Sequence, residues 1–238
     1  MRAQNAEAAH HTDATRVVAS TLGAIVGLAG VDHGIFEIFQ GNVAPGSLMV
    51  EAIGPAQRFW EYGVEPALTI VPSFLVTGIL AVILGLLVTI WSAAFIDGRY
   101  GALIFLLLAV ALFVVGGGFA PIFTTVLAAL TATRIDKPLT WWRRRLPSRL
   151  LALMGKTWLG VLIAFVVLFV ISVEIAIFGW PLTSLFGPDR TLDLLNASAY
   201  VMLGLMILSP LTGLAHDAHA QVERPVQAPY STQTGEAK

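Results

Sequence analysis

The chain has 238 residues, of which 56% are hydrophobic and only 12% are charged. Because a soluble domain carries about 25% charged residues, this composition excludes an ordinary water-soluble surface and indicates an integral membrane protein. The absence of cysteine excludes disulfides, thiolate metal sites and cysteine nucleophiles. The net charge of −1 does not point to any class of partner.

The first apolar stretch covers residues 17–39 and follows a polar segment, residues 1–15, that we expect to be a disordered tail. The stretch is long enough for a membrane span, and no convincing signal-peptide cleavage site follows it. We therefore interpret it as a retained transmembrane helix. Its second half carries three ionisable residues, Asp32, His33 and Glu37.

The second apolar stretch predicts a span over residues 66–94. We expect its helix to begin near Pro66, because proline is favoured in a first turn. The loop before it, residues 40–65, mixes apolar and polar residues, and its aromatic part, residues 56–62, is expected at the membrane interface.

The third apolar block, residues 101–133, would run about 50 Å as one straight helix, whereas the hydrocarbon core is ~30 Å thick. Glycines and a proline interrupt it, at Gly116, Gly117, Gly118 and Pro121. Glycine raises the entropic cost of a helix and proline favours a new helix start. Either the two halves form a hairpin that enters and leaves on the same side, or residues 101–121 span and the rest lies along the interface.

Two further spans are expected, residues 158–180 and residues 197–214, the first with a tryptophan at each end as an interface anchor. These blocks are apolar on every side, which predicts helices and excludes the alternation of a β-barrel. The sequence thus predicts an all-α transmembrane bundle in one domain, residues 16–219, with four full spans and a broken hairpin, or alternatively with five spans. Residues 220–238 are expected to be a disordered tail.

The segment at residues 134–156 is rich in Lys and Arg, and cations concentrate on the cytoplasmic side of a membrane. With the hairpin, only Arg58 and Arg190 lie outside and both termini are cytoplasmic. With five spans, four cations lie outside: Arg2, Arg16, Arg99 and Arg190. The charge distribution therefore favours the hairpin. We expect the protein to lie in a cell membrane.

Ionisable residues inside a membrane are costly and commonly mark the path of an ion, a proton or a substrate. His33 and Glu37 share a helix face one turn apart, and Glu174 lies within the span at residues 158–180. In the hairpin arrangement Asp32, Glu174 and the hairpin tip all fall about 6–7.5 Å beyond the membrane midplane. We therefore predict one site, with Glu65 near its outer mouth, that consists of Asp32, His33, Glu37, Glu65, Glu174 and the backbone of Gly116, Gly117 and Gly118.

Structural alternatives exist for each part of this site. The first span can end near Val31, which leaves its polar residues in the interface. Glu174 can be a protonated acid bonded to a neighbouring helix, and the glycine break can be a simple kink that neighbouring helices satisfy.

Four segments carry a resemblance: DHGIFEIFQGN at residues 32–42, EPALTIVP at residues 65–72, the break at residues 116–121, and PLTWWR at residues 138–143. Together they resemble a group of uncharacterised prokaryotic integral membrane proteins, over roughly residues 20–145. The resemblance implies a membrane location and a prokaryotic source, and it carries no activity.

The leading functional hypothesis is a transport or permeation protein for protons, cations or a small solute. The alternatives are a non-catalytic assembly subunit and a metal-dependent enzyme with His33, Glu37 and Glu174 as ligands. Because the bundle is small for a transporter, we expect a homo-oligomer or a membrane partner. No phosphate-binding, nucleophile or dinucleotide motif appears, so we expect neither a cofactor nor a nucleic-acid partner. Anionic lipids are expected at Arg143, Arg144 and Arg145.

Overall fold

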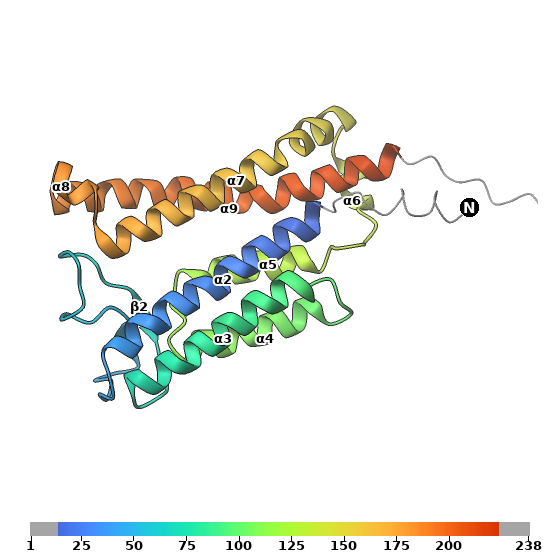
Figure 1. Cartoon of the computed structure of the whole chain (residues 1–238). Helices are drawn as coiled ribbons and strands as arrows, with labels where there is room; N and C mark the ends of the chain where they lie inside the picture. Colours follow the sequence, from blue (N-terminus) through green and yellow to red (C-terminus); the bar gives the residue numbers. More distant parts are fainter. Residues whose placement is uncertain (1–13, 224–238) are drawn as a thin grey trace, which may run out of the picture.

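The computed structural model describes residues 14–223, most of which are helical (Figure 1). Four of the described helices are long and apolar enough to cross a membrane: α2 (Ala14–Phe39), α3 (Phe74–Ala94), α7 (Ser148–Phe178) and α9 (Pro188–Glu223). The shorter helices are α4 (Gly101–Val114), α5 (Pro121–Ala132), α6 (Thr140–Arg145) and α8 (Leu182–Phe186). Strands β1 (Met49–Glu51) and β2 (Pro66–Leu68) pair antiparallel. The predicted all-α transmembrane bundle is confirmed.

The helices form two groups that lie side by side (Figure 1). Helices α2, α3, α4 and α5 make one group, and α7 and α9 make an antiparallel pair beside it. We call the end of the bundle that holds residues 134–147 and Ala14 the basic end, and the end that holds residues 40–73 the loop end. Near the basic end, the carboxylate of Asp217 on α9 accepts hydrogen bonds from the backbone N–H groups of Ala14 (3.1 Å) and Thr15 (2.8 Å). It thereby satisfies donors that every helix start leaves open, and it joins the two groups.

Glycines set the close packing of α2 against α3. A Cβ added at Gly34 would lie 2.6 Å from the carbonyl oxygen of Gly78, and one added at Gly85 would lie 2.6 Å from that of Gly27. Only small residues permit two helix backbones to approach so closely. These two contacts fix the register, in which His33 lies level with the second turn of α3 and Glu37 with its first turn.

Helices α4 and α5 form the hairpin. Figure 1 shows α4 running from the basic end toward the loop end and α5 returning beside it, and both helices pack against α2. The 14 residues of α4 and the 12 of α5 correspond to about 21 Å and 18 Å, too short to cross a ~30 Å core separately. The structure therefore has the hairpin arrangement and not the five-span one.

The segment after β2 descends to meet the hairpin tip and satisfies its backbone. The N–H of Gly116 donates to the carbonyl of Leu68 (2.8 Å), and the N–H of Ile70 donates to that of Val114 (3.1 Å). The hydroxyl of Thr77 donates to the carbonyl of Val115 (2.7 Å). Non-helical backbone at membrane depth is tolerated when protein groups satisfy it in this way.

The expected start of the second span near Pro66 is wrong. Pro66 belongs to β2, where it is paired with Glu51, and α3 begins at Phe74 after Ser73, whose side chain accepts from the N–H of Val76. The helix cap made by Ser73 and the backbone hydrogen bonds between this segment and the hairpin tip outweigh the preference of proline for a first turn.

The bounds of other helices differ from the predicted spans as well. Helix α7 begins ten residues before the predicted residue 158, at Ser148, and α9 covers Pro188–Glu223 instead of residues 197–214. Ala14, Thr15 and residues 220–223 are helical, so these parts of the predicted tails are wrong. The rest of both predicted tails lies outside the described residues.

Candidate functional site: a buried His and carboxyl cluster at the hairpin tip

His33 and Glu37 lie one turn apart on α2 and face the tip of the α4–α5 hairpin. Both side chains are buried: the exposed fraction is 5% for His33 and 0% for Glu37. Their place follows from the glycine packing, because Gly30 and Gly34 on the neighbouring positions bring α2 close to α4 and α3. A histidine and a carboxyl group thus lie side by side in the interior of the bundle.

The tip approaches these two side chains through glycines in unusual backbone conformations. Gly116 has φ +103° and Gly118 has φ +81°, values that side-chain-bearing residues rarely adopt. A Cβ at Gly116 would overlap the carboxylate oxygens of Glu37, and one at Gly118 would lie 2.5 Å from Nε2 of His33. The glycines are therefore required both for the turn and for the contact with the buried pair.

Glu65 reaches the same place from the loop end. Its Oε2 lies 3.4 Å from Nε2 of His33, and its side chain is 22% exposed. The backbone carbonyl of Glu65 accepts a hydrogen bond from the N–H of Ala52 (2.7 Å), which holds the residue beside the β1–β2 pair. Glu65 thus connects the buried histidine with the loop end.

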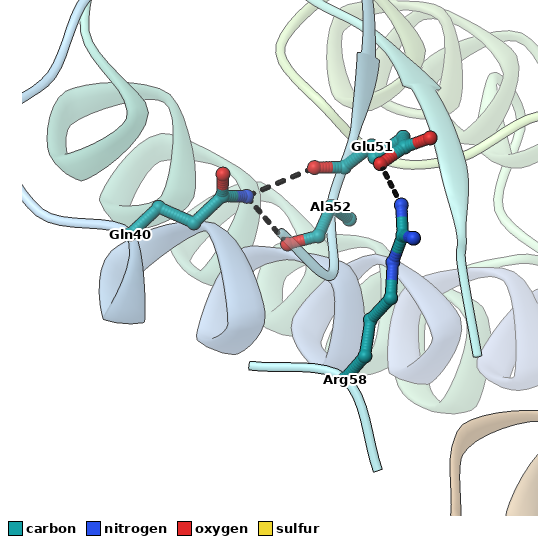
Figure 2. A network of polar contacts seen from close by, with 4 residues as sticks. All are labelled: Gln40, Glu51, Ala52 and Arg58. Carbon is teal, nitrogen blue, oxygen red and sulfur yellow. Dashed lines mark hydrogen bonds and ion pairs between the residues drawn. The ribbon is translucent and has the colours of Figure 1, made fainter. Parts of the chain in front are cut away.

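Figure 2 shows how the loop that carries Glu65 is tied to the end of α2. The amide of Gln40 donates to the carbonyl oxygens of Glu51 (2.9 Å) and Ala52 (2.7 Å), and the guanidinium of Arg58 forms an ion pair with the carboxylate of Glu51. Because Gln40 directly follows α2, these bonds hold the β1–β2 pair above His33 and Glu37.

Three polar atoms of the cluster are buried and have no hydrogen-bond partner among the described residues: both carboxyl oxygens of Glu37 and Nδ1 of His33. Buried polar groups are almost always hydrogen-bonded, and an ionised carboxylate without a partner is very costly to bury. Glu37 therefore needs a proton, a water molecule or a cation in this position. Such exceptions point to a functional role.

Asp32 and Glu174 lie at the edge of the cluster. Asp32 is half-buried and interacts electrostatically with His33, Glu65 and Glu174. Glu174 itself is exposed on α7. The structure thus brings Asp32, His33, Glu37, Glu65, Gly116 and Gly118 together, with Glu174 within electrostatic reach. Gly117 differs, since its nearest contacts are atoms of Leu112.

No match was found for this chain among protein-family models, curated proteins or solved structures. The function must therefore be inferred from the site itself. Among the described residues, no group of three or more His, Cys, Asp or Glu side chains is placed to hold a metal ion.

Sequence reasoning missed two threonines that support the tip. The hydroxyl groups of Thr69 and Thr77 are 2.6 Å apart, and both residues are nearly inaccessible to solvent. Thr77 lies inside an apolar helix, where a buried hydroxyl commonly donates to the carbonyl four residues earlier. Here it donates to the carbonyl of Val115 on the hairpin tip. The presence of a threonine in an apolar span was the available signal, but its partner, Val115, was not predictable from local sequence.

Proposed function

We propose that this protein moves protons across a membrane, alone or in exchange for a cation or a small solute. The observation that carries the proposal is Glu37, a fully buried carboxyl group with neither oxygen hydrogen-bonded to a described residue. His33 lies one turn away, and histidine is the side chain best suited to gain and lose a proton near neutral pH. The 3.4 Å contact between its Nε2 and Oε2 of Glu65 connects this histidine with a side chain nearer the surface.

In this proposal Glu65 exchanges protons with water at the loop end and passes them to Nε2 of His33. Glu37 holds a proton, or the cation that replaces it, under the backbone of Gly116. Asp32 and Glu174 add negative potential at the edge of the cluster, which favours a positively charged substrate. The four carboxyl groups face no Lys or Arg in the described contacts of the cluster.

The route toward the basic end uses hydroxyl groups. The buried polar side chains of α5 and α9 include Thr124, Thr125, Thr131, Ser209 and Thr212. A hydroxyl both donates and accepts a hydrogen bond, so it can take part in a proton relay together with water. These helices pack against α2 and against one another, which places the hydroxyls in the interior of the bundle.

We further propose that the basic end is cytoplasmic, in the cell membrane of a prokaryote. The hairpin places the turn before α4 at this end, where Arg16 and Asp97 form an ion pair of 3.2 Å. The start of α2 and the end of α9 lie there as well (Figure 1). Cations concentrate on the cytoplasmic side. Exposed arginines of α6 would contact anionic lipids there: Arg143, Arg144 and Arg145.

Reconstitution tests the proposal. The purified full chain is placed in liposomes that contain a pH-sensitive dye, and a potassium diffusion potential drives proton entry. We expect wild type and Glu61→Gln to conduct, because Glu61 is an exposed acid of the same loop. Glu37→Gln should lose at least about ten-fold in rate, a lower bound because a positioned proton-transfer group contributes about 10²–10⁴-fold. Equal rates for wild type, Glu37→Gln and empty liposomes would contradict proton transport and favour the assembly-subunit hypothesis.

A further inference from the structure

One face of α9 carries polar groups toward the surrounding membrane. The part of α9 nearer the loop end contacts α7 through Ser198, whose Oγ lies 3.1 Å from Ser172 Oγ. On the opposite side of the helix lie residues that are all exposed. We call this the polar face of α9, and it consists of Asp193, Asn196, Tyr200 and Gly204.

The pairing of α7 with α9 sets the depth of this face. The Ser172–Ser198 contact and the hydrogen-bond distance of 3.1 Å between His216 Nδ1 and the carbonyl of Gly155 fix an antiparallel register. In that register Asn196 lies level with Glu174 and Tyr200 lies level with Val170. The apolar part of α7 is bounded by Trp158 and Trp180, so Tyr200 falls close to the middle of the membrane span.

These positions are unfavourable for a helix that faces lipid. The side chain of Tyr200 is 78% exposed, although tyrosine belongs at the membrane interface and its hydroxyl needs a partner when it leaves water. The amide of Asn196 is likewise exposed, and no hydrogen bond joins it to a described residue. In hydrocarbon such groups promote association between helices, because a neighbouring helix supplies the missing hydrogen bonds.

The face is complementary to itself. An asparagine amide has both donors and an acceptor, so two Asn196 side chains related by a two-fold axis along the membrane normal satisfy each other. Arg190 precedes Asp193 by about one turn, and neither takes part in an ion pair within the described chain. In a parallel pair each arginine lies near the aspartate of the other copy. At Gly204 an added Cβ would meet nothing within 4 Å, which leaves room for a second helix.

We propose that the polar face of α9 binds a second copy of this chain in parallel orientation. Asn196 hydrogen-bonds to its counterpart near the outer part of the span, Tyr200 packs at the centre, and Gly204 permits the close approach of the two helices. The proposal does not depend on proton transport, because the polar face of α9 points away from α3, α4 and α5, which lie around His33 and Glu37.

Cysteine cross-linking tests it, because the natural chain contains no cysteine. Single variants Gly204→Cys and Tyr200→Cys are oxidised with copper phenanthroline in membranes, and Val170→Cys is the matched control. Val170 is 51% exposed on α7 at the depth of Tyr200. We expect a disulfide-linked dimer from both α9 variants in at least about five-fold greater yield than from Val170→Cys, since cross-linking requires close approach.

A second variant examines the cause of the association. Asn196→Leu, introduced into Gly204→Cys, removes the amide and keeps an apolar helix surface, so it should fold while lowering the cross-linked fraction several-fold. Single-molecule photobleaching of the labelled full chain should show two copies per particle, shifted toward one by Asn196→Leu. Equal cross-linking from Val170→Cys, an undiminished yield with Asn196→Leu, or single copies of the unsubstituted chain would each overturn the proposal.

Discussion

Substitution of Gly116 provides the sharpest test of the contact between the hairpin tip and the buried acid. Gly116 has φ +103°, a region in which a Cβ costs about 1–2 kcal/mol. That Cβ would also overlap both carboxylate oxygens of Glu37, and overpacking in a buried site costs about 1–3 kcal/mol. Gly116→Ala should therefore destabilise the protein by about 2–5 kcal/mol, the sum of the two costs.

Gly41 offers a matched control for the backbone part of this cost. It has φ +78°, but a Cβ there would meet nothing within 4 Å, so Gly41→Ala should cost only about 1–2 kcal/mol. The free energy of unfolding is measured by circular dichroism during titration of mixed micelles with dodecyl sulfate. The overlap with Glu37 is isolated by a double-mutant cycle, in which Glu37→Ala should make Gly116→Ala less costly by about 1–3 kcal/mol.

Two outcomes would refute this reasoning. One is an effect of Gly116→Ala no larger than that of Gly41→Ala, which would mean that the carboxyl group does not lie against the tip. The other is strict additivity of Gly116→Ala and Glu37→Ala, since residues in direct contact should not behave independently.

Other substitutions follow from the same geometry. Glu65→Gln removes the charge that faces His33 at 3.4 Å and should slow proton flux about ten-fold, as measured in the dye-loaded liposomes, with an unchanged rate arguing against a role for Glu65. Thr77→Val leaves the Val115 carbonyl without its donor and should cost about 1–3 kcal/mol of stability, whereas Thr77→Ser should cost less; equal losses would show that the hydroxyl bond contributes nothing. In intact cells, an impermeant thiol reagent should label both of two single-cysteine variants at the loop end, Ser47→Cys and Ser184→Cys. Labelling of Ser184→Cys without labelling of Ser47→Cys would mean that α2 crosses the membrane in the opposite direction.

Much of the architecture follows from local sequence. Apolar length identifies the spanning helices, and the break at residues 116–121, the length of its two halves and the distribution of Lys and Arg together favour the hairpin. The convergence of α2 acids with the tip also follows, because equal rises per residue bring both to a similar depth. These features depend on residue spacing, on the distribution of cations and on membrane thickness.

Other features depend on contacts between distant segments and were not predictable. The start of α3 at Phe74 reflects the pairing of Pro66 with Glu51 and the bonds that residues 68–70 make to the tip. The exact fit of Gly116 to Glu37 reflects the register of α2 on α3, which Gly34 and Gly78 set. Local propensity contains neither piece of information, since a helix start or a side-chain contact changes with its tertiary partners.

Infrared difference spectroscopy shows whether Glu37 carries a proton that it exchanges. Spectra of the reconstituted full chain are recorded as the pH is changed, in light and heavy water, for wild type, Glu37→Gln and the control Glu61→Gln. We expect a carboxylic-acid C=O band that titrates, shifts in heavy water, persists in Glu61→Gln and is absent from Glu37→Gln. A band pattern in Glu37→Gln identical to that of wild type would contradict it.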